Sequence, residues 1–295
     1  MADIATAAQP TDFFASAKSA RVGVRSLWSK LLSGICVGLA LLTLVPLFSI
    51  VFLVLKNGLP LLSWRVFTEL PPAAGMTGGG FGNAVVGTVL MVGIALVLAT
   101  PFGVLSAIYI NEYEPFSALS NAVRFVAKLL TGIPSIICGV FAYAVIVLTT
   151  GGFSAWAGGF ALAILILPTI LLTAEQALLG VSKAYREASY GLGATNFQTI
   201  WRVVLPDAMP AIMTGIMLAV ARAAGETAPL IFTALFSQFW IQSLSEPTAS
   251  LSVLIFNFST LPFEHQVKMA WTASLVLVIL VTIANITAQV VFRRR

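Results

Sequence analysis

Two side chains of opposite charge interrupt an apolar stretch late in the chain. Arg222 and Glu226 stand four residues apart within Met209–Leu235, so on a helix they lie one turn apart on the same face. Each charge costs about 2.5–3.5 kcal/mol to place at the centre of a membrane helix. Two interpretations stay open: a structural ion pair, or a guanidinium that offers forked N–H donors to a passing oxyanion. The candidate residues of this solute path are Arg222, Gly225, Glu226 and Thr227.

Other reactive residue types are sparse. His265 is the single histidine, and the cysteines Cys36 and Cys138 both lie in apolar stretches, so we expect no metal site and no disulfide. The chain has no G-x-x-x-x-G-K-[ST] match and no paired catalytic carboxylates. We therefore expect a non-catalytic chain.

A second pattern lies in the polar segment Gly180–Pro206. Ser182–Tyr190 can form a short helix that Gly191 and Gly193 stop, because glycine readily adopts the left-handed conformation of a C-cap.

A second short helix begins at Thr195, where Gln198 completes a capping box. We expect it to end before Pro206, which cannot continue it. The segment predicts two short helices joined by a glycine elbow.

The amino-acid composition indicates the kind of fold that positions these residues. The 295-residue chain is 59% hydrophobic and 9% charged, with a mean hydropathy of +0.98. Such a chain cannot coat a water-facing surface, so we expect an all-α polytopic membrane protein. The six predicted transmembrane helices are Leu31–Leu55, Ala84–Ile110, Leu129–Thr149, Ala155–Leu179, Met209–Leu235 and Met269–Phe292.

The positive charges predict orientation. With a cytoplasmic N-terminus, twelve of the 16 lysines and arginines lie inside, three outside and one within a span. The inside positions are Lys18, Arg21, Arg25, Lys30, Arg124, Lys128, Lys183, Arg186, Arg202 and Arg293–Arg295. The positive-inside rule therefore places both termini in the cytoplasm. No basic-aromatic groove for nucleic acid is present, and the partner of the lipid-facing surface is membrane lipid.

The domain organisation follows. Residues 1–30 form a cytoplasmic segment, either an interfacial amphipathic helix or a solvated basic tail. Residues 31–295 form one transmembrane domain, with outer loops over Lys56–Asn83 and Phe236–Lys268. Glu175, near the inner end of the fourth span, is expected to be a cap or an ion-pair partner.

The Gly180–Pro206 pattern resembles a known motif. Glu187-Ala188-Ser189, then Gly193, Val203 and Leu205-Pro206, resemble the EAA loop of ABC-importer permeases, with Ser and Val at two positions where that loop usually has other residues. The resemblance implies the type I ABC-importer permease fold. It also implies that the loop over residues 180–206 docks on a separate ATPase through Glu187, Ala188, Ser189, Gly193, Leu205 and Pro206.

Further stretches resemble the PstA family of phosphate permeases. They are Phe67-Thr68-Glu69, Gly78–Ala84, Pro134-Ser135-Ile136 and Arg222–Leu230. Leu172 stands where many relatives have an arginine, which leaves Arg222 as the candidate substrate arginine of this chain.

The resemblance implies an ATP-driven importer of inorganic phosphate in a bacterial cell (inner) membrane. Its partners are a second, PstC-like permease subunit, two copies of a PstB-like ATP-binding subunit and an extracytoplasmic PstS-like phosphate-binding protein. No cofactor is expected in this chain, because ATP and Mg²⁺ are used by the ATPase.

A phosphate substrate would explain why a carboxylate, Glu226, lies beside the candidate anion-binding arginine. Phosphate near neutral pH keeps an acidic O–H that a carboxylate can accept, whereas sulfate has none and is repelled. The alternatives are a permease for sulfate, molybdate or another oxyanion, and a secondary transporter or channel, which would leave the Glu187–Pro206 segment unexplained.

Overall fold

The computed structural model describes residues 24–292, and within that range every regular element is helical. The helices are α2 (Val24–Gly58), α3 (Arg65–Thr68), α4 (Gly82–Ile108), α5 (Ala118–Thr131), α6 (Ser135–Ala142), α7 (Leu148–Thr150), α8 (Ala155–Leu179), α9 (Lys183–Gly191), α10 (Asn196–Thr199), α11 (Leu205–Gly225), α12 (Ala228–Thr233), α13 (Leu251–Ser259) and α14 (Glu264–Phe292). A 3-10 turn, η1 (Leu59–Leu61), and three π-helical turns, η2 (Tyr109–Tyr113), η3 (Tyr143–Val147) and η4 (Ile200–Val204), complete the order.

The expected all-α membrane architecture is confirmed. In residues 24–292 five helices are long and apolar enough to cross a membrane, and a bent pair of helices makes a sixth if it counts as one span. Their internal hydrogen bonds satisfy the backbone in hydrocarbon, which lipid cannot do.

The chain divides into two compact units, residues 1–53 and 54–295. The described part of the first unit is residues 24–53 of the helix α2, which carries apolar residues on all sides, and its residues 28–53 are exposed. A helix that is apolar all round is typical of a membrane span. It begins seven residues before the predicted Leu31, and the interfacial helix expected earlier falls mainly on residues 1–23, outside the described range.

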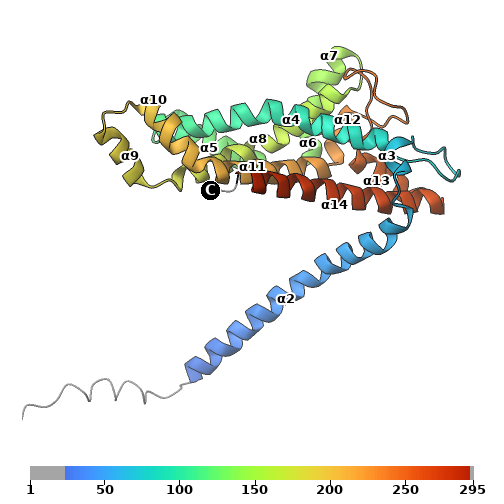
Figure 1. The fold of residues 1–295 in the computed structure, drawn as a ribbon, viewed down its shortest axis with the longest axis horizontal. Helices are drawn as coiled ribbons and strands as arrows, with labels where there is room; N and C mark the ends of the chain where they lie inside the picture. The colour runs from blue at the N-terminus through green and yellow to red at the C-terminus, as the bar shows by residue number, and fades with distance from the viewer. Residues whose placement is uncertain (1–23, 293–295) are drawn as a thin grey trace, which may run out of the picture. The chain divides into compact units, whose positions relative to one another are not determined.

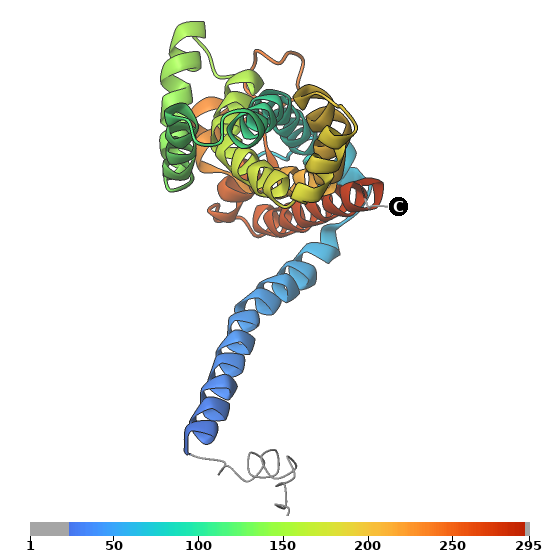
Figure 2. The ribbon, with the colours of Figure 1, turned by 90° about the vertical axis from the view of Figure 1, so that its left-hand side faces the viewer.

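The second unit is built around α4 and α8, which pack on each other more extensively than any other pair of helices. Small residues make this possible: a Cβ on Gly103 would lie 2.9 Å from Ile170 of α8, and Ala95 and Ala99 are fully buried. Such close approach is how helices associate in lipid. Figure 2 looks nearly along α4 (teal) and α8 (yellow-green), with α5–α7 (green) to one side.

The other helices extend this pair. The helix α11 packs on α8, and α14 packs on α11 and α13. Figure 1 shows α9 and α10 at one end of the unit and α3 and α13 towards the other. Charged and glycine-rich segments therefore lie at the ends of an apolar bundle.

Two predicted spans are wrong as continuous helices. In place of Leu129–Thr149, α5 and the segment Ser135–Thr150 meet at an angle of 105°. Pro134 explains the break, because proline disfavours helical geometry in the residue before it. In place of Met209–Leu235, α11 ends at Gly225 and α12 starts at Ala228.

The loop over Phe236–Lys268 also differs from a simple connection, because it contains α13 and the first turn of α14. The other long loop is mostly irregular, as expected, with only η1 and α3 in it. His265, in the first turn of α14, links the second loop to the first, because its Nε2 is 3.0 Å from both the backbone nitrogen and the carbonyl oxygen of Gly78.

Candidate functional site

The break between α11 and α12 has a local cause. Pro229 has no N–H to donate to the carbonyl of Gly225, and its ring would clash with that carbonyl in a continuous helix. Glu226 is accordingly extended, with φ −74° and ψ 127°. Arg222 therefore lies in the last turn of α11, whereas the continuous helix predicted over Met209–Leu235 would have placed it in the helix interior.

The pair of charges persists across the break. Arg222 Nε lies 3.7 Å from Glu226 Oε1, with the two side chains 37% and 19% exposed. A cation in the last turn also interacts favourably with the negative end of the helix dipole. The pairing expected from the spacing is confirmed, although Glu226 no longer continues the helical face.

Two other elements support the break. The backbone carbonyl of Glu226 accepts a hydrogen bond of 2.8 Å from Ser252 Oγ of α13. On the other side, Gly139 of α6 packs so closely on Pro229 that a Cβ at Gly139 would lie 2.6 Å from the Pro229 Cα. These contacts hold the backbone at residues 226–229, so the charges are carried on a fixed support.

The face of the break remains open in this chain. Gly225 is exposed, and a Cβ there would meet no atom within 4 Å, while Thr227 is half-buried at the start of α12. Within residues 24–292, the guanidinium of Arg222 has the Glu226 ion pair and no hydrogen bond shorter than 3.5 Å. Its N–H donors can therefore bind an oxyanion without first breaking strong internal bonds.

The α9–α10 hairpin matches most of its prediction. Ser182 caps α9 through Ala184 N–H, and Gly193 has φ +83°, the left-handed conformation that favours glycine. Thr195 and Gln198 form the capping box. Gly191, by contrast, ends α9 without a positive φ, so Gly193 alone makes the elbow.

The helix after the elbow does not end before Pro206, and that prediction is wrong. The turn η4 continues α10 directly into α11, with Pro206 in the first turn of α11. A π-helical turn bonds five residues back, and the N–H of Leu205 bonds to the carbonyl of Ile200 in this way. The widened turn moves the carbonyl of Arg202 away from the proline ring.

The predicted ATPase-docking residues divide by burial. Glu187, Ala188 and Gly193 are exposed, and so is Pro206. Ser189 is buried and shares a 2.9 Å hydrogen bond with Thr199 Oγ1 of α10, so this side chain holds the hairpin together. Leu205 is buried as well, which places it in the support of the hairpin rather than on its surface.

The same hairpin presents large apolar side chains to its surroundings. Leu192 at the elbow is 90% exposed, and the rings of Phe197 and Trp201 lie 5.8 Å apart. Tyr185 and Tyr190 on α9 are also exposed. Exposed large apolar side chains gathered on one short hairpin are typical of a protein-interaction surface, and sequence reasoning did not single them out.

Two buried ion pairs at the same end of the unit complete the site. Arg186 of α9 donates to both carboxylate oxygens of Glu112, at 2.6 and 3.1 Å. Arg124 of α5 donates from Nε to Glu175 Oε1 of α8 at 2.5 Å. The pair expected for Glu175 is thus confirmed, and Glu112 was missed because its partner lies 74 positions away.

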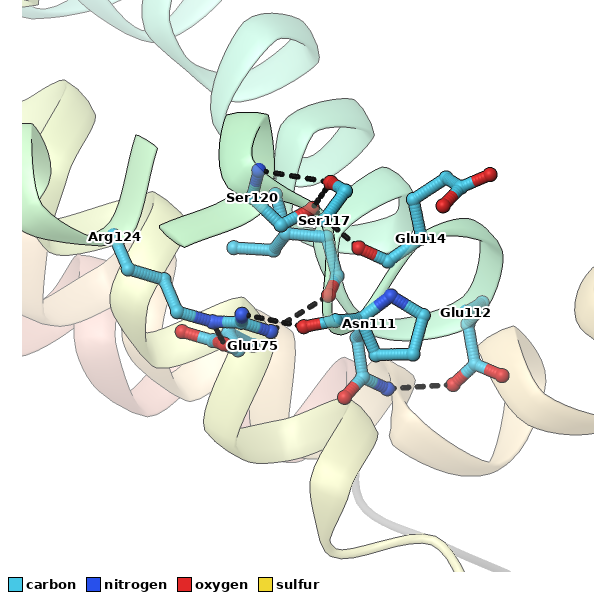
Figure 3. Close-up of polar contacts among 9 residues, drawn as sticks. Asn111, Glu112, Glu114, Ser117, Ser120, Arg124 and Glu175 are labelled. Atoms are coloured by element: carbon cyan, nitrogen blue, oxygen red, sulfur yellow. Dashed lines mark hydrogen bonds and ion pairs between the residues drawn. The ribbon is translucent and has the colours of Figure 1, made fainter. Parts of the chain in front are cut away.

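Each arginine also caps the end of a helix. Arg124 donates to the carbonyls of Ile110 and Pro115, at 2.6 and 2.8 Å, where α4 ends in η2, and Figure 3 shows its guanidinium beside Glu175. Arg186 similarly donates to the carbonyls of Leu178 and Val181, at 3.0 and 2.8 Å, at the end of α8. Carbonyls at a helix C-terminus lack partners and favour a cation.

The described residues hold no group of three His, Cys, Asp or Glu side chains that could bind a metal ion. The polar side chains at the break are an arginine, a glutamate and a threonine. This donor set suits an anion rather than a cation.

Residues 99–295 match the model of a family described as the binding-protein-dependent transport system inner membrane component. The phosphate transport system permease protein PstA of Yersinia pestis is 40% identical over 246 residues, 83% of each chain. The PstA protein of Haemophilus influenzae is 36% identical and covers 92% of this chain and 98% of its own length. A probable PstA of Methanocaldococcus jannaschii is 34% identical over 87% of this chain and 91% of its own.

Solved structures show the same fold. A chain of a bacterial alginate ABC transporter, in complex with an alginate-bound periplasmic protein, matches with a TM-score of 0.62 and 17% identity, over 92% of this chain and 96% of its own. A chain of the inward-facing MetNI methionine ABC transporter matches with a TM-score of 0.56 and 22% identity, over 72% and 92%.

Proposed function

The chain belongs to the PstA family of phosphate transport system permease proteins, and from this membership we propose that it is one transmembrane half of an ATP-driven importer of inorganic phosphate. The chain itself forms part of the path and does not catalyse a reaction. The observation that carries the proposal is Arg222, whose guanidinium lies at a helix break and has donors left for an oxyanion.

Arg222 would bind phosphate through two parallel N–H···O bonds, which a planar guanidinium can form and an ammonium cannot. Glu226 would accept the acidic O–H of phosphate and repel sulfate, which has no such proton. Gly225 and Thr227 would line the path beside them, since Gly225 leaves its surroundings open.

The α9–α10 hairpin would bind the ATPase. Glu187 and Ala188 are exposed on it, as are the apolar side chains of Leu192 and Phe197. Ser189 and Leu205 are buried and support the hairpin. With the hairpin facing the cytoplasm, both chain termini are cytoplasmic and the outer loops face a PstS-like binding protein. A PstC-like permease and two PstB-like ATPase subunits complete the importer.

Reconstitution tests the proposal. The chain would be purified with these partners, placed in proteoliposomes and assayed for uptake of labelled phosphate with and without ATP, and with excess sulfate. We expect ATP-dependent uptake that sulfate does not inhibit.

Uptake of sulfate or molybdate in preference to phosphate would reassign the substrate and keep the mechanism. Phosphate uptake that needs neither ATP nor an ATPase subunit would contradict the proposal. Cysteine labels supply the orientation test: those in residues 236–268 should react with an impermeant reagent from outside, and those at Lys183 should not.

A further inference from the structure

Within residues 24–292, the side chain of Arg186 connects the hairpin that would bind the ATPase to the helices of the bundle through hydrogen bonds. Among the described residues, the α9 side chains that form hydrogen bonds are Arg186 and Ser189. Ser189 bonds to Thr199, which ties α9 only to α10. Of these two α9 side chains, Arg186 is the one that bonds to the ends of α4 and α8.

We propose that the Arg186–Glu112 pair is the joint that transmits movement of α9 to the α4–α8 pair, so that both residues are positioning residues for coupled transport. The inference rests on the proposed function, because it assumes that a partner moves α9. Neither residue touches the solute path at Arg222.

The geometry of the joint opposes sliding. Both carboxylate oxygens of Glu112 accept from Arg186, and the same guanidinium donates to the carbonyls of Leu178 and Val181. Asn111 Nδ2 donates to Glu112 at 2.6 Å and orients it, as Figure 3 shows. A shift of α9 along the bundle would break several charge-assisted bonds at once, so the ends of α4 and α8 are expected to move with it.

Burial makes the bonds strong. The side chains of Arg186 and Glu112 are 18% and 7% exposed, so water competes weakly for either partner. Glu112 lies on the π-helical turn η2, and such turns occur frequently at functional positions. The joint therefore links the exposed helix α9 to α4 and α8, the most closely packed helices of the unit.

The Arg124–Glu175 pair supplies a matched control. It is similarly buried, with side chains 22% and 7% exposed, and its arginine also caps a helix end. Arg124 belongs to α5, however, and its hydrogen bonds reach η2, Pro115 and α8 rather than α9. Removing its partner loosens the bundle without releasing the hairpin.

The test uses the complete importer in proteoliposomes and measures phosphate imported per ATP hydrolysed. For Glu112→Gln we expect complexes that assemble and hydrolyse ATP but import at least fivefold less phosphate per ATP. For Glu175→Gln we expect fewer assembled complexes with an unchanged ratio. A purely structural role of Glu112 would lower assembly and leave the ratio of assembled complexes unchanged.

The joint is rejected if Glu112→Gln retains the wild-type ratio, or if Glu175→Gln lowers the ratio equally. If Glu112→Gln does not assemble, Arg186→Lys decides, since it leaves no carboxylate unpaired but cannot reach Glu112 and both carbonyls together. A wild-type ratio there would also reject the joint. Failure of the proposed function looks different: the wild-type complex itself would then show no ATP-dependent phosphate uptake.

Discussion

The arginine at the break in α11 and the two arginines at the α9 end of the unit differ in how far their donors are used. Arg124 makes three hydrogen bonds of 2.5–2.8 Å, and Arg186 makes four of 2.6–3.1 Å. Arg222 has one ion-pair contact, at 3.7 Å. An arginine in an apolar bundle can thus use nearly all its N–H donors within the protein, or keep them available for a ligand. The number of hydrogen bonds that each arginine makes distinguishes the two cases.

The strongest test of this difference between the arginines removes the charges of Arg222 and Glu226. We expect the double variant Arg222→Leu with Glu226→Leu to assemble, because no buried charge is left unpaired, and to import no phosphate above background. Arg222→Lys should lose roughly 10- to 100-fold, the cost of one or two charge-assisted hydrogen bonds. Uptake would be compared in complexes matched by size-exclusion chromatography, and wild-type uptake by the double variant would leave Arg222 with a structural role only.

At Arg124, whose donors are used in internal hydrogen bonds, we expect a substitution to lower stability. Arg124→Ala leaves Glu175 buried without its cation and two helix-end carbonyls without their donor, and it should cost about 3 kcal/mol of stability. Thermal unfolding of the purified complex measures the loss. Arg65→Ala is the control, because the exposed Arg65–Glu69 pair, at 4.0 Å, should contribute nothing measurable. Equal losses in both variants would remove the distinction between saturated and exposed pairs.

Substitutions at Gly193 test whether transport needs the left-handed elbow conformation of the hairpin. Gly193→Ala forces a side chain into a left-handed conformation and should cost about 1–2 kcal/mol, with a several-fold fall in ATP-driven uptake. Gly193→Pro, whose φ cannot be positive, should abolish uptake.

Gly191→Ala is the matched control for this elbow. Gly191 is helical and a Cβ there meets no atom within 4 Å, so the change should leave uptake unaltered. Loss of uptake in Gly191→Ala comparable to that in Gly193→Ala would show that the elbow conformation is not what matters.

Local signals in the sequence predicted four of the six spans as continuous helices, together with the capping box and the elbow. They could not tell which prolines break a helix: α4 and α8 continue through Pro101 and Pro168, whereas Pro229 interrupts its span. The difference is tertiary, because Ser252 and Gly139 support the extended backbone beside Pro229. The sequence also could not show which residues form the two buried pairs, since the partners are 51 and 74 residues apart.

The smallest effect is expected at Glu226, and it concerns selectivity rather than rate. Glu226→Gln keeps the size of the side chain and an acceptor carbonyl but removes the negative charge that repels a fully ionised anion. Phosphate loses a charge-assisted hydrogen bond and sulfate loses a repulsion, so the preference should fall by about 1 kcal/mol, or roughly fivefold. Uptake of labelled phosphate against increasing sulfate gives the ratio, and Glu69→Gln, which removes the same charge in the exposed outer loop, controls for net charge. An active Glu226→Gln transporter with an unchanged ratio would leave the carboxylate only as the structural partner of Arg222, and the donors of that arginine would then have to account for anion binding alone.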